Sequence, residues 1–423
     1  MPPTATAIDA APRIIEPAAR RADERTGPRR PYLYQLDLFR VLTFACVIGV
    51  HVVGRSTDPS NVAANEVMSL LHFTREAFFA LTGFVLVYQQ ANRPLRAGKF
   101  WRRRIALVGI PYLAWSVIYW AYSIVTGMHV ETARAALWRL VFEIATGGAW
   151  YQLYFLLVTM QVYLLFPLIQ RLLKATAGHH RWVLAVSAAV QVGCLLWLAH
   201  PPTLTGSAAG VWTDLYVTVL PYQFYVLAGA IAAWHIDAID RVVDRFGPMI
   251  VGATVLAGVA AVAVYMDQIG QGVPPWQASE VFQPHLMPFY VLIIGGLYTV
   301  GRWWARHRRS DTLMARAVSL GADRSLGVFL LHPLVLQLLA PVVPWLTSAF
   351  GTLSGVAVLY VVVLAGTLFG TEILRRIPGS LWLTGRPMLH TRLPRIGYRK
   401  AISPVAPTPT YRPLVTQSVP FPR

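Results

Sequence analysis

Charged residues are scarce in this chain of 423 residues, at 13%, whereas hydrophobic residues make up 55%. The mean hydropathy of +0.49 is far above what a single water-soluble core requires, so the composition indicates a membrane protein. Acidic residues are also few, and the formal net charge is +18. The arginines cluster between apolar segments and form no continuous basic face, so this charge indicates membrane topology and excludes a nucleic-acid partner.

Cysteine and lysine are nearly absent. Both cysteines, Cys46 and Cys194, lie inside apolar runs, which excludes a disulfide framework and gives no support for a metal cluster. We therefore expect no metal. Lysine occurs only at positions 99, 174 and 400, and this preference for arginine is typical of a GC-rich, bacterial-type genome.

The two ends of the chain differ from its middle. Residues 1–31 are rich in Ala, Pro and Arg and precede an apolar stretch without a small-residue cleavage site, which predicts an uncleaved signal anchor after a disordered basic segment. Residues 377–423 are basic and rich in proline, so we expect a largely unstructured cytoplasmic tail. The membrane domain is then 32–376.

The apolar segments predict an all-α polytopic bundle of about ten transmembrane helices, because each span needs about 20 mostly apolar residues. Loops 91–104 and 171–181 and two later loops are rich in arginine, whereas the alternate loops hold little beyond Arg55, Arg134 and Arg139. The positive-inside bias therefore places both termini in the cytoplasm and the chain in the plasma (inner) membrane. The predicted spans lie near 36–54, 68–90, 105–126, 150–170, 182–199, 213–234, 248–266, 286–303, 323–347 and 352–373.

Three ionisable residues, Asp37, Arg40 and His51, lie in the first span, where such residues are costly and are functional candidates by default. The 11 positions between Arg40 and His51 put both within about 20° of one helix face and roughly 16 Å apart. Asp37 can form a local ion pair with Arg40. Histidine can accept a proton from a hydroxyl near neutral pH, so we interpret His51 as a general base. The alternative makes Asp37 and Arg40 interfacial anchors and His51 a hydrogen-bonded structural residue.

The second span begins with His72, Arg75 and Glu76 on one helix face, near the expected depth of His51. Glu76 could orient His51 or stabilise its imidazolium, and Arg75 could stabilise a developing oxyanion. An internally neutralised pair of Arg75 and Glu76 is the alternative. Zinc binding by His51, His72 and Glu76 is conceivable, but no ligand spacing requires it.

These residues resemble a known family. Its first helix carries an arginine followed after ten residues by a histidine, as Arg40 and His51 do, and its next helix reads Phe-Phe-x-x-Ser-Gly-Phe, matched here by residues 78–84 with Thr82 in place of serine. The segments FWRRRIALVGIPYLAWSVIYW, WYQLYFLLVTMQVYLLFPLI, YQFYVLAGAIAAW and SLGVFLLHPLVL continue the likeness. In this order, residues 33–373 resemble the integral-membrane acyltransferase 3 family of bacterial type, without a fused extracellular hydrolase-like domain.

The resemblance implies O-acylation, usually O-acetylation, in which an acyl group passes from cytoplasmic acyl-CoA, typically acetyl-CoA, to a carbohydrate, glycolipid or other hydroxyl-bearing acceptor. It implies that His51 is the essential histidine and Arg40 its partner. His332 matches a frequent family histidine, although Pro333 beside it favours a structural hydrogen bond to freed backbone over catalysis. Leu107 stands where the family often has a second basic residue after Arg104.

The predicted function is a membrane acyltransferase whose donor, acyl-CoA, binds from the cytoplasm. Arg102, Arg103 and Arg104 can bind its phosphates bidentately, although positive-inside topology alone also explains them. His51 then serves as a general base or as a transient acyl carrier. The main alternative is a transporter or flippase, because buried charges also mark translocation paths. Paired Gly/Pro-interrupted segments in corresponding halves are not evident, which favours the enzyme over this alternative. The cluster of Asp37, Arg40 and His51 favours it over a non-catalytic scaffold.

Overall fold

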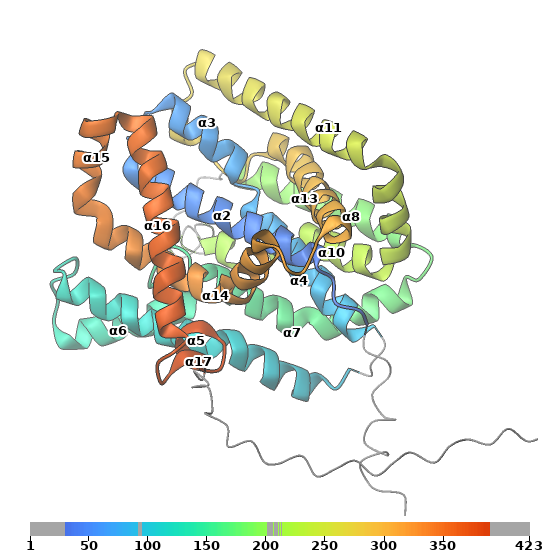
Figure 1. Cartoon of the computed structure of the whole chain (residues 1–423), viewed down its shortest axis with the longest axis horizontal. Coiled ribbons are helices and arrows are strands. Elements are labelled where there is room, and N and C mark those ends of the chain that lie inside the picture. Colours follow the sequence, from blue (N-terminus) through green and yellow to red (C-terminus); the bar gives the residue numbers. More distant parts are fainter. Residues whose placement is uncertain are drawn as a thin grey trace, which may run out of the picture. The chain divides into compact units, whose positions relative to one another are not determined.

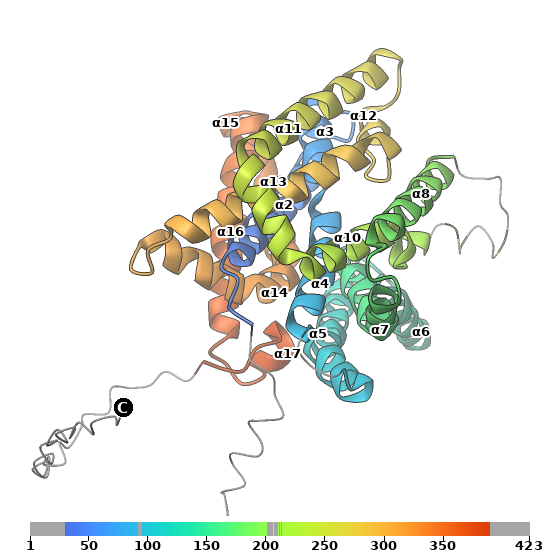
Figure 2. The ribbon, with the colours of Figure 1, turned by 90° about the vertical axis from the view of Figure 1, so that its right-hand side faces the viewer.

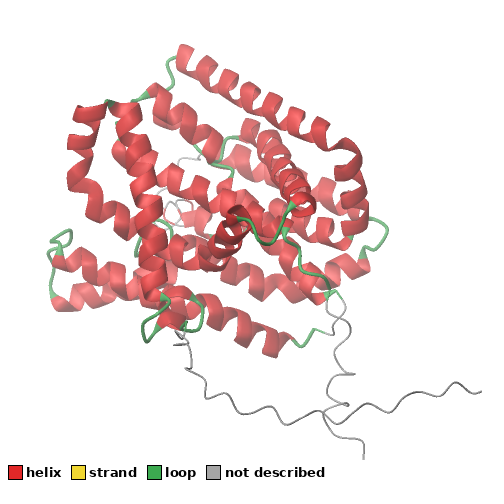
Figure 3. Cartoon of the chain, in the orientation of Figure 1, coloured by secondary structure: helices red, strands yellow, loops and turns green. Residues whose placement is uncertain are grey.

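The computed structural model describes residues 30–91, 95–200, 206, 210, 212 and 214–389, which fold into helices joined by loops (Figure 1). No strand occurs among these residues (Figure 3), so the predicted all-α class is confirmed. The helical elements are α2 (Gln35–Ser56), α3 (Val62–Leu71), α4 (Thr74–Gln90), α5 (Ala97–Val125), α6 (Ala133–Thr146), α7 (Tyr154–Ala175), α8 (His180–Ala199), η1 (Asp214–Val217), η2 (Leu220–Tyr222), α10 (Gln223–Trp234), α11 (Ile236–Gly270), α12 (Pro275–Ala278), η3 (Pro284–Leu286), α13 (Met287–His307), α14 (Leu313–Leu339), η4 (Ala340–Val342), α15 (Val343–Phe350), α16 (Thr352–Leu374) and α17 (Ser380–Thr384).

In the described part of the chain, 9 helical segments are long and apolar enough to cross a membrane, and the protein is a multi-pass membrane protein. Three of these segments are compound, since α3 joins α4, η3 joins α13, and α14 continues into α15. The predicted span near 213–234 is absent from this set because α10 has only 12 residues. A helix of that length covers about 18 Å, whereas the hydrocarbon core is about 30 Å thick.

Contacts between helix ends show that α10 nevertheless runs back to the end of the helix body from which α8 departs. His180 at the start of α8 lies 2.8 Å from His235, which follows α10, so α8 leaves one end of the helix body and α10 returns to it. Tyr88 at the end of α4 bonds to Pro31 before α2 at 2.9 Å, which places the start of α2 beside the end of α4. We call the end that contains the start of α2, the start of α5 and the end of α13 the basic end.

The irregular backbone of 214–222, which includes η1 and η2, lies beside α7 and α8, within the depth of the helix body. Its polar groups are bonded by glutamines of those helices. Gln161 donates to the Val217 carbonyl at 2.7 Å and accepts from the Val219 amide at 2.9 Å. Gln191 donates to the Pro221 carbonyl at 2.7 Å. Non-helical backbone is tolerated at membrane depth only where protein satisfies it in this way.

α4 and α10 cross with their backbones in contact, as Figure 2 shows. A Cβ atom added at Gly83 would lie 2.1 Å from the Val226 carbonyl oxygen, and one added at Gly229 would lie 1.9 Å from that of Ala80. Only glycine at both positions permits this approach. The crossing fixes α4 against the irregular segment before α10.

α2 and the α3–α4 pair occupy the centre of the helix body. Their most apolar stretches are 56% and 61% buried, against 17% for α11 and 22% for α8. The poorly buried helices present apolar side chains outward, as expected of lipid-facing surfaces. The helices that carry the candidate residues are therefore shielded from lipid by the others.

The range 377–423, which was predicted to be an unstructured tail, begins with a short helix, α17. α17 packs between α5 and α14, and Leu383 accepts a 2.9 Å hydrogen bond from the indole of Trp115. A Cβ at Gly385 would lie 3.1 Å from the Leu107 carbonyl oxygen. Apolar and small residues in this stretch bury it despite its basic character. Residues 390–423, like the N-terminal residues 1–29, lie outside the described part of the chain.

Candidate active site

A cavity of about 370 Å³ opens at the end of the helix body opposite the basic end. It lies between α2, α4, the loop before α7 and α14, and its rim includes the exposed residues Gly54 and Arg55. Its lining residues are Val47, Val50, His51, Gly54, Arg55, Met68, His72, Thr74, Arg75, Phe78, Tyr151, Gln152, Tyr154, Phe155, Val281 and Phe329. The structure thus brings together His51, His72 and Arg75, which sequence analysis had singled out on two separate helices.

His51 is half-buried in the cavity wall and packs between two rings. The centroid of its imidazole lies 4.6 Å from that of Tyr151 and 5.2 Å from that of His332 on α14. A tyrosine near a span end also suits the membrane interface, but the contact of Tyr151 with His51 gives it a place in the site. These neighbours hold the ring without a carboxylate.

The other two histidines are held by backbone carbonyls. The Nδ1 atom of His72 lies 2.9 Å from the Ser279 carbonyl oxygen, and that of His332 lies 3.2 Å from the Val328 carbonyl oxygen. Because a carbonyl can only accept, each Nδ1 carries the hydrogen and each Nε2 keeps a lone pair. The Nε2 of His332 is buried and has no partner among the described residues. The expected structural hydrogen bond of His332 is therefore present, and the ring also contacts His51.

Arg75 reaches across to α7 and does not pair with its neighbour. Its Nη1 donates to the Tyr154 hydroxyl at 3.0 Å, its guanidinium lies 4.8 Å from the Phe282 ring centroid, and its buried Nη2 has no described partner. Glu76 is buried and does not line the cavity, and its Oε2 is unbonded within the described residues. Within the described residues, the alternative of an Arg75–Glu76 ion pair is not formed either, because adjacent residues on a helix point in directions about 100° apart. Nor does the structure bring Glu76 to His51.

Thr82 has a local role in α4. Its hydroxyl donates to the carbonyl of Phe78 one turn earlier at 2.8 Å. It stands beside Gly83, where α4 crosses α10. Thr82 therefore belongs to the helix crossing and does not line the cavity.

At the basic end, the expected ion pair between Asp37 and Arg40 forms, with 3.8 Å between Oδ1 and Nη1. The Tyr32 hydroxyl also donates to Asp37, at 2.7 and 2.9 Å from its two oxygens. Burial, followed by this hydrogen bond, raises the pKa of Tyr32 to about 12. Arg40 does not line the cavity of His51, so the two predicted partners lie at different depths of α2.

The arginine run at the start of α5 divides into two groups. Arg102 and Arg103 are exposed, whereas Arg104 is half-buried and donates to Gln89 of α4. The charges of Arg104 and Arg40 both act on Tyr163 of α7. Arg104 and Arg40 therefore lie near each other at the basic end.

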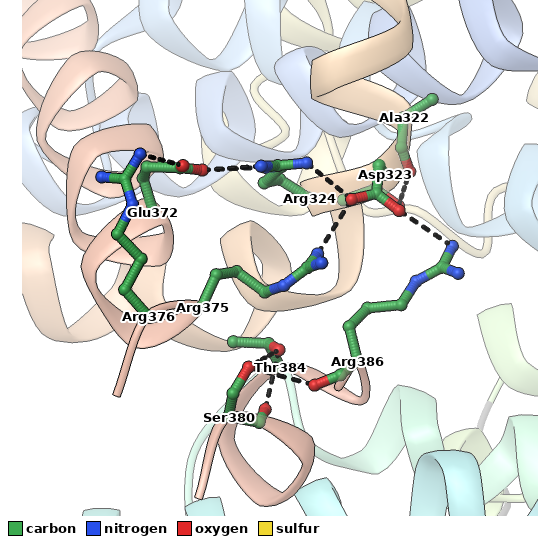
Figure 4. Close-up of polar contacts among 10 residues, drawn as sticks. Ala322, Asp323, Arg324, Glu372, Arg375, Arg376, Ser380, Thr384 and Arg386 are labelled. Atoms are coloured by element: carbon green, nitrogen blue, oxygen red, sulfur yellow. Dashed lines mark hydrogen bonds and ion pairs between the residues drawn. The ribbon is translucent and has the colours of Figure 1, made fainter. Parts of the chain in front are cut away.

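Sequence analysis missed an ion-pair network close to these arginines (Figure 4). Asp323 of α14 receives Arg324 at 2.6 Å, Arg375 at 2.8 Å and, from beyond α17, Arg386 at 3.6 Å. Arg324 also pairs with Glu372 of α16 at 2.8 Å. The network joins α14, α16 and the segment after α17, and the charge of Arg386 acts on Arg40.

Gln152 is a second cavity residue that sequence analysis missed. Its side chain is 2% exposed, and neither amide atom has a hydrogen-bond partner among the described residues. In the sequence, Gln152 is distinguished only by its place in WYQLY, the start of one of the segments that resemble the acyltransferase 3 family. No group of three or more His, Cys, Asp or Glu side chains in the described residues could hold a metal ion.

Comparison with known families agrees with this arrangement. A family profile described as "Acyltransferase domain", of the acyltransferase 3 type, matches residues 33–372. No curated protein and no solved structure matches the chain. The profile covers most of the chain and spans α2 to α16, including every cavity residue. The protein therefore belongs to the acyltransferase 3 family and is a membrane acyltransferase.

Proposed function

We propose that the enzyme transfers an acyl group, typically acetyl, from acyl-CoA at the basic end to a hydroxyl of a carbohydrate, glycolipid or similar acceptor in the His51 cavity. The observation that carries this proposal is the position of His51, which lines a cavity opening away from the basic end. Arg40 lies on nearly the same face of α2, roughly 16 Å away along the helix. An extended pantetheine arm can bridge a distance of that order. Positive-inside topology makes the basic end cytoplasmic.

The donor phosphates would bind to arginines at the basic end. Arg104 and Arg40 are better placed than the exposed Arg102 and Arg103, because both are half-buried at the basic end. Guanidinium groups bind phosphates bidentately and keep their charge at all physiological pH values. The thioester would then extend between the helices toward His51.

Direct transfer uses His51 as general base. The imidazole takes the proton of the acceptor hydroxyl, the oxygen attacks the thioester carbonyl, and the carbon–sulfur bond breaks as the tetrahedral intermediate collapses. The proton on His51 then passes to the CoA sulfur, which leaves as a thiol. The unbonded Nη2 of Arg75 can donate to the transient oxyanion.

A two-step route uses the same residues. A ring nitrogen of His51 attacks the thioester, CoA leaves as a thiol, and the acceptor hydroxyl attacks the acyl-imidazole. The lone pairs on Nε2 of His72 or His332 would then accept the hydroxyl proton. Rapid acid quenching followed by mass spectrometry of the peptide containing His51 distinguishes the routes, because only the second leaves an acylated histidine.

The test is acyl transfer by the purified protein in lipid nanodiscs, with radiolabelled acetyl-CoA and a panel of glycans and glycolipids. His51→Ala should lower the rate by about 10²- to 10⁴-fold, the usual contribution of a general base. His129→Ala, in an exposed loop away from the cavity, is the matched control. A His51→Ala protein that turns over like His129→Ala would exclude His51 from the chemistry. Failure of the wild type to bind acetyl-CoA would exclude this donor.

A further inference from the structure

The His51 cavity is cationic and contains no counter-charge. Arg55 and Arg75 line it, and no Asp or Glu is among its lining residues. Within the described residues, neither arginine lies within ion-pair distance of a carboxylate. The half-buried Arg75 carries a desolvation cost unless an anion reaches it, and Arg55 stands at the exposed rim, where its guanidinium can receive an anion.

Arg55 stands directly beside His51. It lies four residues later on α2, which places it on nearly the same helix face and about 6 Å farther along. Its guanidinium lies 4.8 Å from the Tyr151 ring centroid, and the same ring contacts His51 at 4.6 Å. A ligand group bound by Arg55 would therefore lie close to the imidazole of His51, since the two side chains contact the same ring.

The cavity wall also contains buried polar atoms that the protein leaves unbonded. Gln152, which is 2% exposed, has both amide atoms without a described partner, and Arg75 has a buried free Nη2. Each unsatisfied buried group costs about 1–3 kcal/mol. Atoms of this kind gathered around one cavity indicate a ligand that offers both donors and acceptors, as a hydroxylated, anionic molecule does.

The two arginines have different tasks in acyl transfer. Arg75, fixed by Tyr154, supplies the free donor that an oxyanion needs. Arg55 is not tied to another side chain by a hydrogen bond or an ion pair within the described residues, and its guanidinium contacts the Tyr151 ring. We infer that the acceptor carries a phosphate or carboxylate close to the hydroxyl that is acylated, and that Arg55 binds this anionic group. The inference rests on the proposed function, and it adds the charge of the acceptor.

The experiment compares three sugars that differ only at C6: methyl β-D-glucoside, methyl β-D-glucuronide and methyl β-D-glucoside 6-phosphate. Their binding is measured by isothermal titration calorimetry to the full-length protein in phosphatidylcholine nanodiscs. Each anionic sugar should bind the wild type about tenfold or more tightly than the glucoside, the size expected for a charge-assisted hydrogen bond. Arg55→Gln should reduce this preference to under about threefold, and Arg55→Lys should retain part of it. Arg134→Gln, on the exposed face of α6, should leave it unchanged.

Three results would overturn the inference: no binding of the anionic sugars, equal binding of all three, or an unchanged preference in Arg55→Gln. A second set of nanodiscs containing phosphatidylglycerol identifies the source of the anion. If these lipids abolish the preference of the wild type, Arg55 binds bilayer headgroups, and the assignment to the acceptor is wrong.

Release of CoA thiol in the same nanodiscs separates this inference from the proposed function. Selective binding of anionic sugars without any transfer from acetyl-CoA would contradict the proposed function alone. Equal transfer to the anionic sugars by wild type and Arg55→Gln would contradict the inference alone. Both stand if transfer favours the anionic sugars and this preference depends on Arg55.

Discussion

Gly229→Ala provides the most direct test of how the fold supports the site. The new Cβ would lie 1.9 Å from the Ala80 carbonyl oxygen and 2.6 Å from its carbonyl carbon. These are backbone atoms of a helix, so no change of rotamer can relieve the contact. To reach even 3.0 Å, which real Cβ contacts rarely undercut, the α4–α10 contact must open by about 1.1 Å.

The effect should reach both stability and rate. Overpacking of this kind costs about 1–3 kcal/mol. α4 also carries Arg75, and His72 lies two residues before its start, so its displacement moves both residues relative to His51 on α2. A misplacement of about 1 Å can lower a catalytic rate by about 10²-fold. We therefore expect a lower melting temperature together with a large loss of acyl transfer.

The matched control is Gly252→Ala on α11. Its added Cβ meets nothing within 4 Å, so the substitution gives the helix-propensity gain of about 1 kcal/mol without a clash. Thermal unfolding in detergent and CoA release in nanodiscs are measured for both variants. If Gly229→Ala melts and turns over like Gly252→Ala, the crossing does not constrain the site and the reasoning fails.

Three further substitutions test other features. Gln161→Leu should destabilise the protein by about 1–3 kcal/mol per lost bond, because it leaves two backbone groups of the irregular segment unsatisfied; a melting temperature equal to wild type would contradict this. Asp323→Asn should loosen the segment after α17, seen as faster limited proteolysis there, whereas Arg376→Gln, exposed at the rim of the same network, should not. Because the folded-state pKa of Tyr32 is raised to about 12, its contribution to stability is complete below pH 10 and is lost as the pH rises through 12. Tyr32→Phe should lack this alkaline loss in pH-dependent melts.

Hydropathy and charge predicted that the chain is a bundle of membrane-spanning helices, but they did not predict how each span is built. The bounds of α2, α5, α7 and α16 follow the apolar runs closely, because lipid requires each to be a continuous helix. The pass containing α10 differs, since glutamines on two neighbouring helices satisfy its irregular part. Such partners are distant in sequence, so a single-segment pattern cannot reveal them.

The candidate site was predicted only where its residues share a helix face. His51 and the pair of His72 and Arg75 stood out because each is costly within an apolar segment. Tyr151 and Gln152 carry no comparable signal, since a tyrosine near a span end also suits the membrane interface. Their approach to His51 depends on how the loop before α7 packs against α2, which is a tertiary contact. Sequence analysis placed Glu76 beside His51 because of its spacing from His72. It did not consider the direction in which the Glu76 side chain points relative to that of Arg75.

The hydrogen bonds of the three histidines indicate which of them can move a proton. His72 and His332 each commit Nδ1 to a backbone carbonyl, so a change of tautomer would break that bond. Within the described residues, His51 makes only ring contacts and can carry its hydrogen on either nitrogen. A general base must accept a proton at one nitrogen and return it without losing its position. The Nε2 of His72 and of His332 can do so as well, and His51 is set apart because, held by the rings of Tyr151 and His332, it can accept the proton at either nitrogen.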